Sequence, residues 1–227
     1  MTGQAKIEIR KKKILAAAEK VFARQGFQDA TISEIAKEAK ISEASIYEYF
    51  NTKEGLLFSI PGEAARQVFD LMDFHLRLIR GAAVKLRAII YILLSSYQKN
   101  PDFASVLMLL LKHNKNFMKS SGYEVIREGI RNIDNVLEEG IASGEFRPGL
   151  NVYLIRSVIL GAIEHLVTNW VMKGDASENL TQLTDPLIDT IIEGIRHPES
   201  GRRDTYWELR KSPVPLPSDE GRGSDRN

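Results

Sequence analysis

The chain has 227 residues, of which 43% are hydrophobic and 27% charged, so it can bury a core of ordinary size and is not globally disordered. Its 31 basic and 30 acidic side chains give a formal net charge of +1, so any basic surface for nucleic acid must be a local one. The absence of cysteine excludes a disulfide framework, a thiolate metal site and a cysteine nucleophile.

Helical periodicity runs through nearly the whole sequence and predicts an all-α chain of about nine helices joined by short loops. The first helix is expected from Ile7 to Arg24. Its core-facing stripe repeats at positions i, i+1, i+4, i+7 and i+8 and consists of Ile14, Leu15, Ala18, Val21 and Phe22. Gly26 then favours a helix end.

The following residues predict two short helices separated by a tight turn. Thr31 and Glu34 have the spacing of a capping box, which begins a second helix that runs to the turn at 40–42. Ser42 is the expected N-cap of a third helix at 43–50. Two short capped helices braced by a longer first helix are typical of a helix-turn-helix, whose second helix enters the major groove of DNA.

The predicted third helix carries side chains that suit contact with DNA. Ala44 and Ser45 are small, so the backbone can approach the bases closely. Tyr47 and Tyr49 can pack a ring on a sugar or a thymine methyl and can hydrogen-bond a phosphate with the hydroxyl. Lys53 falls in the first turn of a fourth helix, where a cation beside free backbone amides favours a phosphate.

Three residues of this segment have alternative interpretations. Phe50 lies four residues after Ile46, and both are expected to anchor the helix in the core. Tyr47 is either a DNA contact or a core aromatic like Phe50, and we favour the DNA contact. Glu43 either accepts a hydrogen bond from a cytosine amino group or only caps the third helix, and the sequence does not decide between these roles.

Pro61-Gly62 predicts the boundary between a DNA-binding domain, 1–60, and an effector-binding and dimerisation domain, 61–197. From Pro198 onward Pro, Gly, Ser, Arg and Asp dominate, so 198–227 is predicted to be a disordered tail. Between these limits the pattern predicts helices at 63–79, 84–99, 102–112, 122–143, 151–173 and 178–196.

The last two predicted helices are apolar over more than one face, which indicates that they need a second partner besides the core. We expect them to form a four-helix dimer interface, two helices from each chain, and the two-fold symmetry would suit a palindromic operator. The expected interface residues are Ile159, Ile163, Leu166, Trp170, Leu187, Ile191 and Ile195.

A small-molecule effector is expected between helices of the second domain, in a mostly apolar pocket with a few polar groups. Glu164, His165 and Asn169 interrupt an apolar helix and either orient a ligand or are satisfied polar groups at the dimer seam. The candidate wall residues, each of which could equally be ordinary core, are Phe74, Leu78, Leu93, Tyr97, Phe103, Met108, Leu111, Phe117 and Ile163.

Residues 31–56, TISEIAKEAKISEASIYEYFNTKEGL, resemble the signature of the TetR/AcrR family of transcriptional regulators. That family shows Thr, an Ile-Ala pair, a Gly-Val-Ser turn, a small residue, Leu-Tyr-x-His/Tyr-Phe and Lys-Glu-x-Leu, in the same register. Lys40 stands where the family usually has a turn glycine, and Ala44 replaces a common Gly or Pro.

The resemblance implies a homodimeric repressor that binds double-stranded operator DNA and is released by an effector. It implies phosphate contacts by Thr31, Tyr47, Tyr49 and Lys53, and base reading by Ser33, Glu43, Ala44 and Ser45, with Ser42 beside them. A basic start at Lys6, Arg10, Lys11, Lys12 and Lys13 fits an arm along the DNA backbone or the minor groove, although such a run is also compatible with a plain solvated face.

Four further stretches resemble the TetR branch linked to fatty-acid metabolism, whose members sense acyl-CoA thioesters. This resemblance implies an acyl-CoA effector, with Arg127 and Arg131 meeting its phosphates at the mouth of an apolar tunnel. The stretches are Leu57-Phe58-Ser59-Ile60-Pro61, Asn100-Pro101-Asp102-Phe103-Ala104, Glu138-Glu139-Gly140-Ile141 and Gly161-Ala162-Ile163-Glu164-His165.

Other classes of function fit the sequence less well. The four histidines show no metal-ligand spacing, and no phosphate-binding loop or nucleophile motif appears, so we expect no metal, no cofactor and no enzyme activity. The polar N-terminus is unlike a secretory signal, and charges interrupt the apolar segment 150–172, so we expect a cytoplasmic protein without a membrane partner. A transcriptional activator of the same fold and a helical adaptor without DNA binding remain as alternatives.

Overall fold

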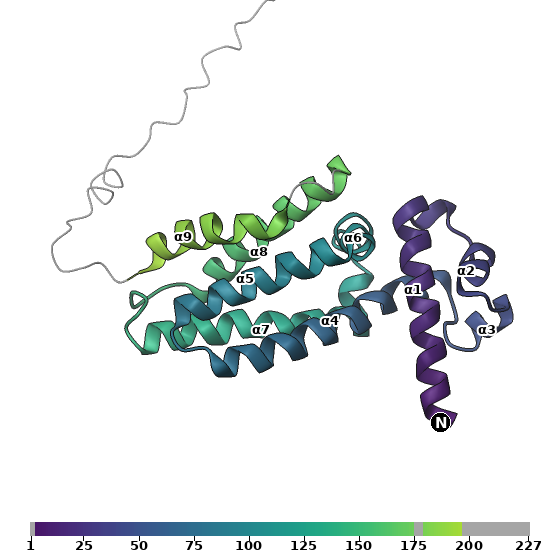
Figure 1. The fold of residues 1–227 in the computed structure, drawn as a ribbon, viewed down its shortest axis with the longest axis horizontal. Coiled ribbons are helices and arrows are strands. Elements are labelled where there is room, and N and C mark those ends of the chain that lie inside the picture. The colour runs from purple at the N-terminus through teal and green to yellow at the C-terminus, as the bar shows by residue number, and fades with distance from the viewer. Residues whose placement is uncertain (1–2, 175–178, 197–227) are drawn as a thin grey trace, which may run out of the picture. The chain divides into compact units, whose positions relative to one another are not determined.

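A computed structural model describes residues 3–174 and 179–196 of the chain, and within them the fold is entirely helical. Figure 1 shows α1, α2 and α3 grouped at one end, with α4 leading from them into a bundle of the later helices. Apart from one isolated bridge between Phe146 and Arg196, the described residues contain no β-structure. The prediction of an all-α fold is confirmed.

The first three helices form a small core at the N-terminal end. α1 spans Gly3–Asp29, longer than predicted at both ends, with a break at Gly26, where φ is 77° and ψ is 178°. α2 spans Ile32–Ala39 and α3 spans Glu43–Tyr47, so α3 ends three residues before the predicted limit. The packed side chains at this end include Ile14, Ala18, Val21, Phe22, Ile35, Ile46 and Phe50, all buried, as the apolar stripes predict.

The turn between α2 and α3 uses a left-handed residue that is not glycine. Lys40 has φ 53° and ψ 50°, which places its backbone in the region that glycine adopts most easily. Its N–H donates to the carbonyls of Ala36 and Lys37, and the N–H of Ile41 also donates to Ala36. The turn therefore caps α2 in the manner of a glycine C-cap, but with a lysine.

α4 spans Lys53–Leu78 without interruption, so the predicted helix break at Pro61-Gly62 is wrong. Proline inside a helix lacks one N–H donor and crowds the preceding turn. Here Leu57, Ile60 and Pro61 are all buried, and their packing compensates for the missing bond. The helix therefore links the N-terminal core directly to the bundle, and the domain limits at 60 and 61 stay a prediction.

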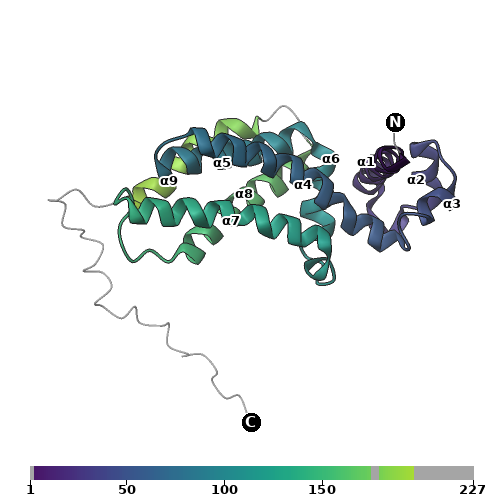
Figure 2. The same cartoon turned by 90° about the horizontal axis from the view of Figure 1, so that it is seen from below.

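The bundle is built from α4 and the remaining helices, as Figures 1 and 2 show from two directions. α4 packs along α7, and α5 contacts α4, α7, α8 and α9. The predicted helix 102–112 is divided into a short α-helix and a π-helical turn, and the predicted helix 178–196 begins with a 3-10 turn. The elements are α5 (Ala82–Lys99), α6 (Pro101–Ser105), the π-helical segment Val106–Leu111, a 3-10 turn at Phe117–Lys119, α7 (Ser121–Ala142), α8 (Val152–Lys173), a 3-10 turn at Leu180–Leu183 and α9 (Thr184–Ile195).

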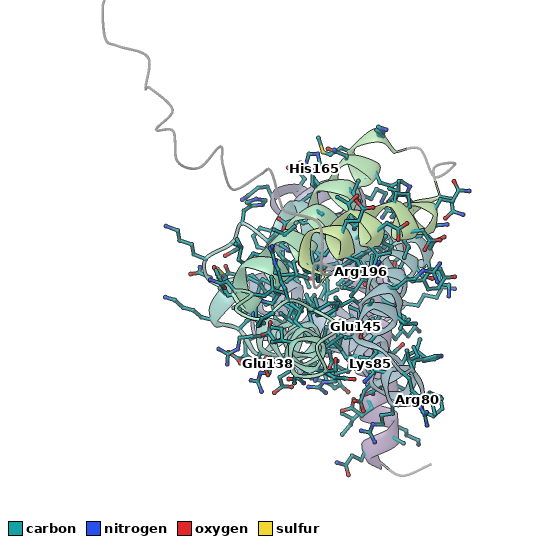
Figure 3. The ribbon with its side chains drawn as sticks, turned by 90° about the vertical axis from the view of Figure 1, so that its left-hand side faces the viewer. Arg80, Lys85, Glu138, Glu145, His165 and Arg196 are labelled. Carbon is teal, nitrogen blue, oxygen red and sulfur yellow. The ribbon has the colours of Figure 1, made fainter. Side chains whose placement is uncertain are left out.

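The end of the bundle opposite α1 is closed by the segment after α7, seen end-on in Figure 3. Glu145 accepts hydrogen bonds from the backbone N–H of Ala82 at 2.6 Å and of Ala83 at 3.0 Å, so its carboxylate caps α5. The ring of Phe146 fills the space above Gly140, where a Cβ atom would lie 2.2 Å from the ring. These contacts fix the α4–α5 turn against α7.

The predicted disordered tail, 198–227, lies outside the described residues, as do residues 175–178. By length and composition alone, α8 is apolar enough to cross a membrane, and it is the one such helix in the described part of the chain. It packs against α5, α6 and α7, with Ile159, Ile163, Val167 and Trp170 buried. That packing is typical of a helix at the surface of a folded bundle.

Candidate functional site

Most of the side chains predicted to meet DNA gather on the outer surface of α2 and α3. Thr31, Ser33, Ser42, Glu43 and Ala44 are exposed at the starts of these two helices. The side chain of Tyr47 is 50% exposed, so its interpretation as a core aromatic is wrong. Ser45 and Tyr49 are half-buried, and Tyr49 packs against the core.

Two caps hold these helix starts in position. Thr31 Oγ1 accepts from Glu34 N at 3.2 Å, while the Glu34 carboxylate accepts from Thr31 N at 3.0 Å, which confirms the predicted capping box. Hydrogen bonds from Thr31 and Gln25 to Glu34 lower the pKa of this carboxyl, so it stays ionised near neutral pH. At α3, Ser42 Oγ accepts from Ser45 N at 3.2 Å.

Lys53 is turned towards the protein in this structure. Its ammonium donates to the backbone carbonyl of Ala30 at 2.8 Å and of Gln28 at 3.3 Å, and it lies 4.6 Å from the ring centroid of Phe27. These contacts tie the start of α4 to the end of α1. The ammonium would have to leave them, or share them, to contact a phosphate.

The basic residues at the start of the chain form part of α1 rather than a separate arm. Lys6, Arg10 and Lys13 are exposed on the helix. The ammonium of Lys12 instead lies 2.8 Å from the Glu63 carboxylate of α4, and this contact raises the pKa of Lys12. An exposed pair of this kind contributes little to stability, but it neutralises one of the charges predicted to face DNA.

The bundle encloses a cavity of about 800 Å³, within the usual range of small-molecule sites. Its walls come from α4, α5, the π-helical segment, α7 and α8. Of the residues predicted to bind an effector, the cavity wall includes Leu93, Tyr97, Met108, Phe117 and Ile163. The set is mainly apolar, as the sequence predicts for an effector site.

The other four predicted wall residues lie elsewhere. Phe74 is 62% and Leu78 is 71% exposed, because the face of α4 that carries them points away from the bundle. Phe103 and Leu111 are buried in the core beside the cavity. Phe103 still has an indirect place in the site, because its ring stacks on that of Tyr97 with centroids 6.1 Å apart.

Much of the cavity wall that α7 supplies was not predicted from the sequence. The lining side chains of α7 include Tyr123, Ile126, Ile130 and Ile133, which recur at helical spacing along its inner face. This stripe was visible in the sequence, but periodicity alone does not show whether an apolar face meets other side chains or an open space. Other wall residues that were not predicted include Phe69 and Met72 of α4, Ile89 of α5, Leu107 of the π-helical segment, Met118 of the 3-10 turn that follows it, and Ser157, Leu160 and Gly161 of α8.

Two ion pairs contribute side chains to the cavity wall. Asp134 of α7 pairs with Arg156 of α8. The ammonium of Lys112 lies 2.5 Å from the carboxylate of Glu164. Glu164 is therefore a satisfied polar group, and its partner belongs to the same protomer. Burial raises the pKa of Tyr97 to about 12, and its neutral hydroxyl is a hydrogen-bond donor at the cavity wall.

Two arginines of α7 lie at the cavity wall near the surface. The guanidinium of Arg127 is 2.7 Å from the Glu124 carboxylate, in a pair exposed to solvent on both sides. Arg131 is exposed and makes no ion pair with any residue that the structure describes. The cavity therefore combines a mainly apolar interior with cationic groups close to its mouth, as the predicted placement of both arginines requires.

Most of the predicted dimer residues are unavailable to a partner chain. Ile159, Ile163, Trp170, Ile191 and Ile195 are 7% exposed or less, because they face the core of their own protomer. Leu166 and Leu187 are half-buried. For these five residues the prediction of a dimer interface is wrong, because the apolar stripe that they form is the inward face of each helix.

α8 nevertheless presents a second apolar face to solvent. Leu154, Val158 and Met172 are about half exposed or more, and His165 and Asn169 lie on the same side of the helix. Asn169 Nδ2 and His165 Nε2 are 3.0 Å apart, so these two polar groups bond to each other rather than to the core. We define Leu154, Val158, His165, Asn169 and Met172 as the outer face of α8.

Comparison with known proteins gives matches along most of the chain. A family model described as bacterial regulatory proteins, tetR family, matches residues 14–60, and one described as YsiA-like protein, C-terminal region, matches residues 65–194. A fatty acid metabolism regulator protein of Bacillus subtilis is 32% identical over 184 residues, which cover 81% of this chain and 94% of that protein.

Solved structures agree with these matches. The regulator FadR from Bacillus subtilis, determined in complex with stearoyl-CoA, has a TM-score of 0.76 and 32% identity, covering 82% of this chain and 99% of that one. The fatty acid degradation regulator FadR from Bacillus halodurans has a TM-score of 0.75 and 31% identity over the same shares of the two chains.

Proposed function

Since the chain belongs to the TetR family of bacterial regulatory proteins, we propose that it is a ligand-responsive transcriptional repressor. In this proposal the cytoplasmic protein binds a palindromic operator as a homodimer through α2 and α3. An acyl-CoA thioester fills the cavity of the bundle and releases the DNA. The observation that carries the proposal is the course of α4, which begins just after the helix-turn-helix and continues unbroken to the cavity wall at Phe69 and Met72.

The support for DNA binding is the exposed ring of Tyr47 at the end of α3. The Tyr47 ring is half exposed at the end of α3, and the core does not need it, because Ile46 and Phe50 are already buried there. Its hydroxyl can reach a phosphate while the capped helix starts present backbone N–H groups nearby. An adaptor without DNA binding leaves this arrangement unexplained.

The support for an acyl-CoA is the combination of an apolar interior with arginines near the mouth. The volume of about 800 Å³ is ample for a hydrocarbon chain. Arg131 is free among the described residues to meet phosphate groups, as guanidinium groups commonly do. The relative from Bacillus subtilis was solved with stearoyl-CoA, a ligand of this chemical class.

The first test is the selection of binding sites from random duplex DNA by the purified protein. We expect one palindromic sequence to be enriched, and Tyr47→Ala to lose it. Tyr91→Ala is the matched control, because Tyr91 is 52% exposed and lies on α5 in the bundle, away from α3. Failure of the wild-type protein to enrich any sequence at low salt would contradict DNA binding.

The second test adds acyl-CoA thioesters to the selected complex in a mobility-shift assay. We expect release of the DNA, with a higher half-effective concentration for Arg131→Ala because a phosphate contact is lost. Transcription from the same template in vitro separates a repressor from an activator of the same fold. If no acyl-CoA releases the DNA or raises the melting temperature, the proposed effector class is wrong.

A further inference from the structure

The crossing of α4 and α7 depends on a glycine at the cavity wall. A Cβ atom built on Gly129 would lie 2.1 Å from two atoms of the Phe69 ring and 2.2 Å from a third. Carbon atoms do not approach so closely, so the Phe69 ring occupies the place that any other side chain at 129 would take. The nearly equal distances to three adjacent ring atoms show that the ring lies with its face against Gly129.

Both residues of this pair also line the cavity. Phe69 is one of two wall residues that α4 supplies, and Gly129 lies midway among the wall residues of α7, between Ile126 and Ile133. The ring therefore sits beside the middle of the cavity rather than at either end. Its present position in the gap above Gly129 keeps it back from the open space.

We infer that the Phe69–Gly129 pair determines how long an apolar chain the cavity accepts. With glycine at 129 the ring is withdrawn into α7 and the two halves of the cavity are continuous. With alanine at 129 the ring must move by more than an ångström, and the open space beside it is the cavity itself. The displaced ring would then narrow the middle of the cavity and leave room for short chains only.

This inference rests on the proposed acyl-CoA effector and has its own signature. Each methylene that enters an apolar site strengthens binding by roughly fourfold until the chain meets an obstacle. A narrowed cavity therefore keeps its affinity for a short chain and loses the gain from further methylenes. A mutation that only loosens the fold would weaken short and long chains alike.

The experiment measures the affinity of the full chain for octanoyl-, dodecanoyl- and hexadecanoyl-CoA by calorimetry. For Gly129→Ala we expect octanoyl-CoA to bind as in the wild type, within about threefold, and hexadecanoyl-CoA to bind more than ~10-fold more weakly. Gly194→Ala is the matched control, because it is also a helical glycine and its added Cβ meets no atom within 4 Å.

A second variant separates the pair from a general packing defect. Phe69→Leu with Gly129→Ala removes the ring that the new methyl group displaces, and we expect it to recover most of the affinity for hexadecanoyl-CoA. An unchanged chain-length profile in Gly129→Ala, or an equal loss for all three ligands, would overturn the inference. If the wild-type protein binds none of the three, the proposed effector fails instead.

Discussion

At the scale of single residues, backbone conformation sets the shape of the helix-turn-helix of α2 and α3, here called the DNA-reading head, and of α1 behind it. Lys40 adopts φ 53° and ψ 50° in the turn before α3, and Gly26 adopts φ 77° and ψ 178° at the break in α1. A left-handed conformation costs a residue with a side chain ~1–2 kcal/mol. Glycine reaches it without that cost but loses more freedom on folding. The turn at Lys40 thus holds a strain that the chain could release by one substitution.

Lys40→Gly should therefore stabilise the protein by about 0.5–1 kcal/mol, which is the strain relieved less the added entropy of the unfolded chain. Urea unfolding followed by circular dichroism would show a higher midpoint with an unchanged slope. Gly26→Ala is the opposing control, because that backbone conformation is open only to glycine, and we expect it to destabilise the chain. A lower midpoint for Lys40→Gly would mean that its side chain makes a stabilising contact.

At the scale of elements, one polar link joins α1 to the start of α6. Asn100 Nδ2 donates to Glu19 Oε1 at 2.9 Å, while Asn100 Oδ1 accepts from Phe103 N at 3.2 Å and caps α6. The ring of Phe103 in turn stacks on Tyr97 of the cavity wall. α6 therefore packs against a residue of the cavity wall at one side and against α1, the helix behind the helix-turn-helix, at the other.

Asn100→Asp should break this link while it keeps the cap. Two carboxylates would then face each other, at a place where burial already raises the pKa of Glu19. We expect a loss of about 1–3 kcal/mol near neutral pH, measured by urea unfolding. A raised carboxyl pKa stabilises the fold below its unfolded value of 4.5 and loses that contribution as the pH rises, so the deficit should shrink towards acid pH.

The double variant Asn100→Asp with Glu19→Gln reverses the direction of the hydrogen bond. The glutamine amide can donate to the new aspartate, so the link is restored with a single charge. We expect it to recover most of the lost stability. An equal deficit in the single and double variants would indicate that Asn100 acts only through local packing.

At the scale of the whole molecule, the outer face of α8 is the surface that a second copy would cover. Leu154, Val158 and Met172 are exposed along one side of this helix, although its opposite side is fully packed. An apolar face of this kind is typical of a subunit interface, and a homodimer places two reading heads on a palindrome.

Val158→Glu should consequently shift the protein from dimer to monomer, because a carboxylate buried without a partner strongly opposes association. Light scattering would measure the mass, and a mobility-shift assay would show weaker operator binding. Leu71→Glu is a matched control, because Leu71 is 51% exposed on α4, close to the 49% of Val158. A dimer that survives Val158→Glu would place the interface elsewhere.

The helix-turn-helix could be predicted closely from the sequence, because its signals are local. The Thr31 and Ser42 caps and the turn at Lys40 each depend on a few neighbouring residues, and the structure confirms them. α4 was predicted as two helices because Pro61 disfavours a helix interior unless tertiary packing offsets it. That packing comes from residues distant in the sequence, and no local pattern contains it.

The cavity and the dimer surface were harder to predict for a related reason. Leu78 and Leu93 look alike in a helical pattern, yet one is exposed and the other lines the cavity. Likewise Ile159 and Val158 are neighbours on an apolar helix, but only the latter reaches solvent. Periodicity identifies that a face is apolar, whereas the identity of the surface opposite it depends on the packing of the whole chain.

The continuity of α4 also constrains how hybrid regulators can be built from this protein. α4 begins just after the helix-turn-helix and reaches the cavity at Phe69, so the number of residues between these two points sets the rotational phase of the cavity wall relative to the helix-turn-helix. A one-residue insertion there would turn Phe69 by about 100° and advance it by about 1.5 Å, whereas seven residues would restore the phase to within about 20°. A chimera that exchanges DNA-reading heads between relatives should therefore keep the number of residues along this helix, because that number fixes how the head is oriented relative to the cavity.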